Sequence, residues 1–289
     1  MNSLLETITE WIRQGLIGAI MESFTSMFDS INQQVGDVAT QVGTTPAGWS
    51  PGVYSMIQSL SETVVIPIAG MILTFVLCYE LINMLIERNN FHDFESFLIF
   101  KWVFKTFCAV YILTNTFNIV MAIFELAQNV VNQSAGLISG GLEIGGGAAM
   151  DALETQLEAM GMWGLLGLWM QTSIVHLCIM AMSICVFIIT YGRMVEIYMV
   201  VSVAPIPLST MANREWGQIG NNYLKSLFAL GFQGFLIMVC IAIYSVLIQS
   251  ISTADSVYMA IWGCAGYTAL LCFTLLKTGS LAKSLFGAH

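Results

Sequence analysis

Arg193 and Glu196 lie three residues apart in an otherwise apolar stretch, YGRMVEIYMVVSVAPIPLSTMANREW, at residues 191–216. At this spacing two side chains can meet on one face of a helix and form an ion pair. In apolar surroundings such a pair can act as a gate at the base of a passage. It can also be a plain structural pair near lipid headgroups, which is the interpretation we favour. In either case, removing one partner of a buried pair leaves a lone charge, at a cost of roughly 3–5 kcal/mol.

Glu80 and His176 are two further ionisable residues inside long apolar segments. Ionisable groups within membrane spans are candidates for a functional role. Glu80, however, lies near the predicted end of its segment, and the sequence names no partner for His176. We therefore favour a satisfied structural role for each.

Signatures of catalysis are sparse. The nucleotide-binding patterns GxGxxG and GxxxxGK[ST] and the metalloprotease pattern HExxH do not occur in the sequence. The three histidines are too scattered to suggest a metal site. We therefore predict no catalytic residue, no cofactor, no metal site and no small-molecule ligand.

The composition is that of a polytopic membrane protein. Of the 289 residues, 57% are hydrophobic and 9% are charged, whereas soluble domains contain about 25% charged residues. No run of basic residues occurs, so a direct DNA-binding surface is not expected. The seven cysteines fall inside apolar segments without a CxxC pair and are interpreted as small buried hydrophobic residues. Glu6 and Glu10 precede any Lys or Arg, which does not fit a secretory signal.

Five apolar runs predict transmembrane helices, and the fold class is therefore an all-α polytopic helical bundle. The predicted spans are about 63–86, 97–126, 162–190, 224–250 and 257–276. Residues 63–289 form the predicted membrane domain, in which a glycine-rich, acidic loop covers 127–161. Residues 1–62 are predicted to form an extracytoplasmic amphipathic helix, over 1–31, followed by a loop. That helix would lie in the membrane interface, pack on a neighbouring subunit or simply dock on this chain.

The basic residues indicate the orientation. Eight of the nine Lys and Arg residues fall on one side of these spans, whereas the regions 1–62, 127–161 and 251–256 hold only Arg13. The positive-inside rule then predicts an extracytoplasmic N-terminus and a cytoplasmic C-terminus.

The same rule constrains the stretch at 191–216. Arg193 and Arg214 should both face the cytoplasm, so residues 194–213 cannot cross the membrane once. Pro205 and Pro207 cannot continue an ordinary helix, and a re-entrant or in-plane hairpin that turns at these prolines is the first expectation. The alternative is that the third span continues as one bent helix to about Ser202.

Residues 192–239, GRMVEIYMVVSVAPIPLSTMANREWGQIGNNYLKSLFALGFQGFLIMV, resemble the TrbL-type membrane component of conjugative type IV secretion systems. The similarity is closest to the versions on integrative conjugative elements of Firmicutes, and it covers most of the chain. The residues that match are Arg193, Glu196, Ala204, Pro205, Pro207, Arg214, Trp216 and Gly220.

The resemblance implies a five-span subunit of the bacterial cytoplasmic membrane, with its N-terminus outside. It also implies a homo-oligomer that contacts the ATPases and surface components of the system. Such subunits help to route relaxase-bound single-stranded DNA across the membrane. Many relatives have a large soluble C-terminal extension, which the residues after Leu276 are not expected to supply.

Two functions from different classes follow. The first is a scaffold or channel subunit of a conjugation machine for a mobile genetic element. The second is a self-contained transporter or channel whose broken helix lines a substrate site at the membrane midplane. A transporter would be expected to carry a matched pair of breaks in its two halves, and the sequence indicates one break, which favours the first.

Overall fold

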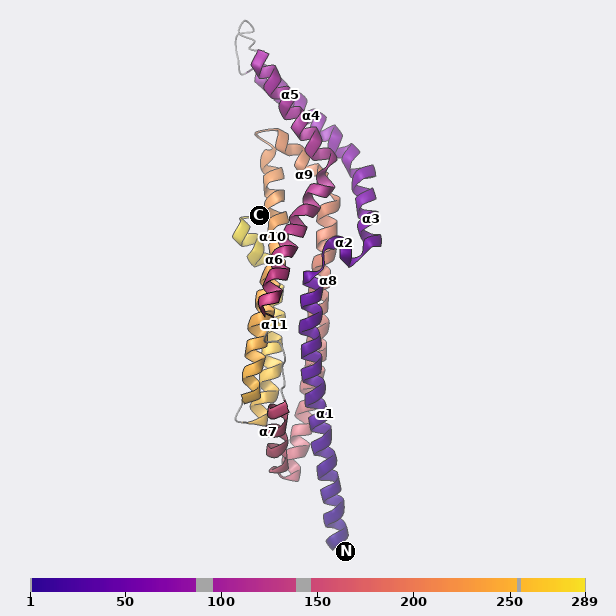
Figure 1. The fold of residues 1–289 in the computed structure, drawn as a ribbon, viewed down its shortest axis with the longest axis vertical. Helices are drawn as coiled ribbons and strands as arrows, with labels where there is room; N and C mark the ends of the chain where they lie inside the picture. The colour runs from indigo at the N-terminus through magenta and orange to yellow at the C-terminus, as the bar shows by residue number, and fades with distance from the viewer. Residues whose placement is uncertain (1, 87–95, 139–146, 254–255, 289) are drawn as a thin grey trace. The chain divides into compact units, whose positions relative to one another are not determined.

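A computed structural model describes residues 2–86, 96–138, 147–253 and 256–288, and in these ranges the regular structure is entirely helical (Figure 1). The chain divides into two compact units. Unit 1 comprises Met1–Val42, Gln133–Thr190 and Ile237–Lys277. Unit 2 comprises Gly43–Asn132, Tyr191–Leu236 and Thr278–His289.

Unit 1 is built from long helices that bury one stripe each. Its elements are most of α1 (Asn2–Gly43), α7 (Gly147–Glu158) and parts of α8 (Met162–Ser202), α10 (Gly217–Gln249) and α11 (Val257–Phe286). Ile20, Phe24, Met27 and Ile31 on α1 are fully buried, and their spacing of three or four residues is that of one helix face. Arg13 on the same helix donates hydrogen bonds to the carbonyl groups of Glu158 and Met160, which end and follow α7.

Unit 2 contains the short helices and two apolar cores. The remaining elements are α2 (Pro46–Trp49), α3 (Pro51–Leu60), α4 (Ile66–Ile86), α5 (Ser96–Thr114), α6 (Thr116–Ile138) and α9 (Pro205–Ser209). One core joins α6, α8 and α10 through Phe124, Ile197 and Leu227. The other joins α4 and α5 to the segment after α8, through Leu73, Leu113 and Ala212.

Four helical segments are long and apolar enough to cross a membrane, and up to five if a bent pair counts as one span, within the described ranges. The four are Pro51–Ile86, Met162–Ala212, Gly217–Gln249 and Val257–Phe286. In the bent pair, Ile99–Thr114 and Thr116–Ser134 meet at 68°. The protein is thus an all-α polytopic bundle, as the sequence predicts.

Several predicted boundaries are wrong in detail. The predicted loop at 32–62 is mostly helical, because α1 continues to Gly43 and α2 and α3 follow. The predicted loop at 127–161 is largely helical too, since α6 extends to Ile138 and α7 begins at Gly147. Glycine and polar residues favour loops in these two regions, but neither prevents a helix whose other face is buried. Residues 87–95, between the first two predicted spans, and residues 139–146, within the predicted loop at 127–161, lie outside the described residues.

The predicted third span, 162–190, is also too short. Helix α8 is continuous through residue 190 and ends at Ser202, which matches the alternative of one continued helix. The helix therefore breaks only after Ser202, next to Pro205 and Pro207, where the sequence predicts the turn.

In the N-terminal helix the buried residues begin further along the chain than the sequence predicts. Ile8 and Trp11, on the predicted apolar face, are 49% and 77% exposed, and full burial begins at Ile20. The apolar face of the first turns is thus open within unit 1.

Candidate functional site

The segment that links α8 to α10, residues 203–216, is shaped by its two prolines. Pro205 has no N–H to donate to the carbonyl group four residues earlier, so α8 cannot continue through it. The amide of Ala204 instead donates to the Val201 oxygen at 3.2 Å, and the amide of Ile206 donates to the Val203 oxygen at 3.1 Å. Pro205 then begins α9 at a position where its missing donor costs nothing. We call residues 203–216 the connector.

Gly220 holds the connector close to α10. A Cβ atom at this position would overlap the Met211 side chain and would lie 2.8 Å from the Pro207 carbonyl oxygen. Such a distance to a backbone atom is not found for real side chains, so only glycine fits without a shift. Pro207 and Gly220, both in the predicted motif, are therefore the two sides of one backbone contact.

Trp216 attaches the connector to α4. Its indole ring stacks on Phe75, with ring centroids 5.6 Å apart and planes at 12°. It also stacks on Tyr79, at 5.3 Å and 9°. Offset stacking of this kind stabilises aromatic pairs beyond the area that they bury.

The Glu80 carboxylate accepts hydrogen bonds from side chains on two other elements. It accepts a hydrogen bond of 2.6 Å from the Lys105 ammonium on α5 and one of 2.8 Å from the Asn213 amide on the connector. We call Glu80, Lys105 and Asn213 the Glu80 cluster. The Asn213 side-chain oxygen accepts hydrogen bonds from the amides of Glu215, at 2.7 Å, and Trp216, at 3.1 Å.

The sequence points to Glu80 as a candidate but to neither of its partners, Lys105 and Asn213. The available signal was an asparagine followed by a helix start at Gly217, because asparagine side chains bind the amides of the next residues in turns and caps. No local signal pointed to its bond with Glu80.

A cavity of about 330 Å³ adjoins the Glu80 cluster. Four charged side chains besides Lys105 line it, namely Glu80, Lys101, Arg214 and Glu215, together with polar and aromatic residues that include Asn83 and Trp102. Arg214, a predicted motif residue, is thus an exposed side chain at the wall of this cavity.

Arg193 is buried, with 4% of its surface exposed, and does not form the predicted pair with Glu196. Its Nη2 atom donates to the Gly231 carbonyl oxygen at 3.5 Å, and its Nε atom has no hydrogen-bond partner in the described residues. A Cβ atom on Gly234 would lie 2.8 Å from the same Nη2 atom. The guanidinium group therefore packs against the glycine face of α10.

Glu196 pairs elsewhere, with Lys283 at 3.6 Å. The reason lies in the helix periodicity. Arg193 lies one turn before Ile197, on the buried face of α8, whereas Glu196 lies beyond the edge of that face and is half exposed. Arg193 and Glu196 thus lie beyond ion-pair distance, although the two charges still interact electrostatically, and the direct contact of Glu196 is with Lys283.

His176 lies in unit 1 and is half buried, and within the described ranges it makes no hydrogen bond. The structure thus brings Glu80 together with the connector, and Arg193 together with α10, but it joins His176 to neither group by a hydrogen bond. These described ranges contain no group of three or more His, Cys, Asp or Glu residues placed to hold a metal ion.

The pattern GxSxG, which typically marks a serine nucleophile, occurs once, at Gly48–Gly52. It needs a sharp strand-to-helix turn to expose the serine. Here Ser50 separates helices α2 and α3, so this context is missing and the pattern does not indicate catalysis.

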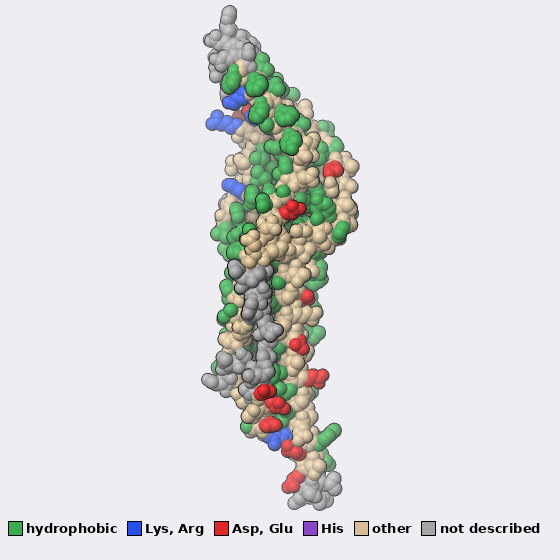
Figure 2. Space-filling model, in the orientation of Figure 1, with side chains coloured by type: hydrophobic (Ala, Val, Ile, Leu, Met, Phe, Trp, Pro, Cys, Tyr) green, Lys and Arg blue, Asp and Glu red, His purple; other side chains and the backbone are tan. Residues whose placement is uncertain are grey.

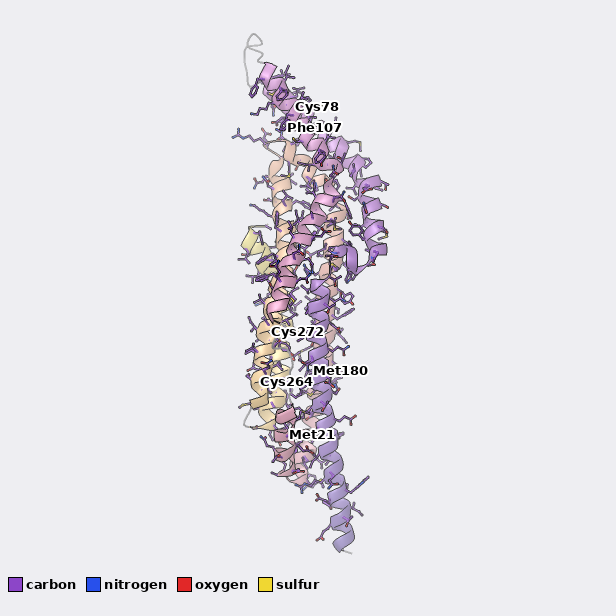
Figure 3. All side chains as sticks on the ribbon, in the orientation of Figure 1. Met21, Cys78, Phe107, Met180, Cys264 and Cys272 are labelled. Atoms are coloured by element: carbon purple, nitrogen blue, oxygen red, sulfur yellow. The ribbon has the colours of Figure 1, made fainter. Side chains whose placement is uncertain are left out.

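The cysteines differ in exposure. All seven are free thiols. Cys264 and Cys272 on α11 are buried, whereas Cys78 on α4 is exposed. Figure 3 labels all three. The prediction of buried cysteines is therefore correct for Cys264 and Cys272 and wrong for three others, namely Cys78, Cys178 and Cys185.

Comparison with protein families gives one match. A family model described as "TrbL/VirB6 plasmid conjugal transfer like protein" matches residues 31–205, which is more than half of the chain. The matched range ends at Pro205, so it includes all of α8 and both Arg193 and Glu196. Searches of curated proteins and of solved structures gave no match.

Proposed function

Because the chain belongs to the TrbL/VirB6-like family of plasmid conjugal transfer proteins, we propose that it is a scaffold or channel subunit of a conjugative type IV secretion apparatus. The family match over residues 31–205 is the observation that carries this proposal. The multi-pass helical fold supports it, since a subunit that helps substrate across a membrane must itself span that membrane. No catalytic step is part of the proposal.

The proposal has finer parts. The protein is the version carried by integrative conjugative elements of Firmicutes, as the resemblance of residues 192–239 implies. Its N-terminus lies outside the cell and its C-terminus in the cytoplasm, as the distribution of Lys and Arg favours. It works as a homo-oligomer with the ATPases and other subunits of the apparatus, and it transiently meets relaxase-bound single-stranded DNA.

We further propose that the second half of α8 and the connector form the functional region. Arg193 supports this choice because a buried cation with an unsatisfied Nε atom costs free energy. We take that cost as a sign that the charge of Arg193 has a role. Pro205, Pro207, Ala204, Trp216 and Gly220 shape and attach the connector, and their role is structural.

Crosslinking of transferring DNA tests the proposal. Val195, Met199 and Val203 follow one another at one-turn spacing and are 47%, 58% and 45% exposed. Each would be changed to cysteine in a chain whose seven native cysteines have been replaced, and each would carry a photoactivatable crosslinker during active conjugation. We expect DNA adducts at one or more of these positions.

Two matched controls sharpen the test. Phe104 and Phe107 on α5 are exposed to a similar or greater degree, 61% and 66%, and Figure 3 shows the position of Phe107. Cysteines there should give fewer adducts. If none of the three positions reacts with DNA while a neighbouring subunit does, the channel role fails and a scaffold role remains. If the purified protein alone transports a small solute into liposomes and its loss leaves conjugation intact, the transporter alternative replaces the proposal.

A further inference from the structure

The cavity beside the Glu80 cluster has features of an anion site. We propose that it binds the phosphate group of an anionic phospholipid, whose acyl chains lie along α4 and α5. No part of this inference depends on the role of the protein in DNA transfer. The cavity lies wholly within unit 2, between the end of α4, the start of α5 and the connector.

The charges around the cavity leave two cations available. Lys105 is neutralised by Glu80, at 2.6 Å. Glu215 accepts a hydrogen bond of 3.3 Å from the Tyr79 hydroxyl group. Lys101 and Arg214 also line the cavity, and neither forms an ion pair with a described residue. The cavity is therefore lined by three cations and two carboxylates. Once Lys105 and Glu80 are paired, two cations and one carboxylate, that of Glu215, remain.

The hydrogen bonds of the Glu80 cluster fix the wall of the cavity. Asn213 is 3% exposed and is bound both to Glu80 and to the backbone of the connector. These bonds hold Arg214, the next residue, at the cavity wall. Arginine binds phosphate oxygens through two parallel N–H donors, and lysine binds them as a point charge.

The size of the cavity admits such a group. Its volume of about 330 Å³ corresponds to the space of roughly ten liquid waters. Trp102 lines the cavity and donates from its indole nitrogen to the Leu77 carbonyl oxygen at 3.4 Å. Tryptophan with its N–H engaged and its ring against an apolar surface is typical of the headgroup level of a bilayer.

The surroundings favour a lipid over a free phosphate ion. Exposed apolar side chains flank the cavity on both helices, with Ile86 at 68%, Phe97 at 70%, Phe100 at 66% and Phe104 at 61%. Figure 2 shows Lys and Arg side chains beside hydrophobic ones near this end of α4 and α5. A free anion would gain nothing from these apolar side chains, whereas acyl chains would cover them. Basic pockets between membrane helices bind anionic headgroups in this way.

The binding test uses the full chain in neutral detergent. Phosphatidylglycerol or zwitterionic phosphatidylcholine is titrated in, and bound lipid is counted by native mass spectrometry. We expect saturable binding of phosphatidylglycerol and little binding of phosphatidylcholine. Lys101→Gln and Arg214→Gln should each weaken the binding roughly fivefold, since one basic residue near an anionic surface contributes about that factor.

Lys225→Gln is the matched control. Lys225 is an exposed cation of unit 2 outside the cavity, so its loss changes the net charge equally and should leave lipid binding unchanged. An equal loss of binding in all three variants would overturn the proposal, because a general charge effect would then explain it. Should a variant fold poorly, a photoactivatable phosphatidylglycerol on the wild-type chain decides the matter. Labelling is expected at residues 80–86, 97–105 or 213–216, and labelling confined to other residues would contradict the site.

Two further arms separate the possible sources of phosphate. Inorganic phosphate and a short single-stranded oligonucleotide are each added in place of the lipid. Binding of inorganic phosphate as tight as that of the lipid would show an anion site without a lipid role. Oligonucleotide binding that falls in Lys101→Gln and Arg214→Gln, with lipid binding unaffected, would assign the cavity to nucleic acid instead.

Discussion

The Glu80 carboxylate on α4 accepts a 2.8 Å hydrogen bond from the side-chain amide of Asn213, which lies 133 positions later in the sequence. Through its side-chain oxygen, Asn213 also fixes the amides of Glu215 and Trp216. One buried asparagine thus ties the end of a membrane helix to the start of another. The connector is held by this bond, by the stacking of Trp216 and by the close approach at Gly220.

Asn213→Ala should lower the stability of unit 2. It leaves a carboxylate with one donor fewer and two backbone amides without an acceptor, and each lost bond to a charged group is worth about 1.5–3 kcal/mol when buried. Because the Glu80 side chain is 25% exposed, we expect a smaller net loss, about 1–2 kcal/mol. Thermal unfolding in detergent measures it. A double-mutant cycle with Glu80→Gln should give a coupling of roughly 1 kcal/mol, and strict additivity would contradict the bond.

Gly220→Ala should be damaging although it adds one methyl group. The new Cβ atom would meet the Met211 side chain and the Pro207 carbonyl oxygen, and overpacking of this kind costs typically 1–3 kcal/mol. The control is Gly192→Ala, because a Cβ atom at Gly192 meets nothing within 4 Å. That variant should unfold at the same temperature as the wild type or slightly higher. Equal unfolding temperatures for the two variants would refute the close contact.

Arg193→Met separates a functional charge from a structural one. Methionine fills a similar volume without burying a charge, and such replacements are often neutral or stabilising. We expect an unfolding temperature equal to or above that of the wild type, together with at least a tenfold loss of conjugation frequency. Unchanged conjugation would remove Arg193 from the functional region, and a large loss of stability would show that its charge is structural.

Gly234→Ala should destabilise the protein through Arg193. Its Cβ atom would lie 2.8 Å from the guanidinium Nη2 atom and 3.2 Å from a methyl group of Val131. We expect a cost of roughly 1–2 kcal/mol in the wild type and a smaller cost in the Arg193→Met background, where the flexible thioether can move. The same cost in both backgrounds would mean that Val131, rather than Arg193, limits the space.

Trp216→Ala should loosen the connector from α4. It removes two stacked contacts, with Phe75 and Tyr79, each worth about 0.5–1.5 kcal/mol beyond buried area. We expect a loss of roughly 2 kcal/mol in detergent unfolding, and Trp216→Phe should restore about half of it. Phe228→Ala serves as the comparison. It removes a 47% exposed ring of the same unit with one, wider, stacked contact, to Phe286 at 6.4 Å, and should cost less.

The sequence by itself determined the features that depend on local chemistry. Apolar runs had to become membrane helices, because a backbone in lipid must satisfy its own hydrogen bonds. Pro205 had to end a helix, because it lacks the N–H that the preceding turn requires. The sequence did not determine the structure of residues 32–60, because glycine and polar residues permit a loop but do not prevent a helix that gains burial elsewhere.

Only the tertiary structure decided which charges meet. The i,i+3 spacing of Arg193 and Glu196 permitted a pair, but the buried face of α8 passes through Ile197 and Val201, and it takes Arg193 inward while Glu196 turns toward Lys283. Glu80 found Lys105 and Asn213 on two other elements. Such partners are chosen by the packing of whole helices, since a polar group in apolar surroundings binds whichever donor the packing brings within reach, whatever its separation along the chain.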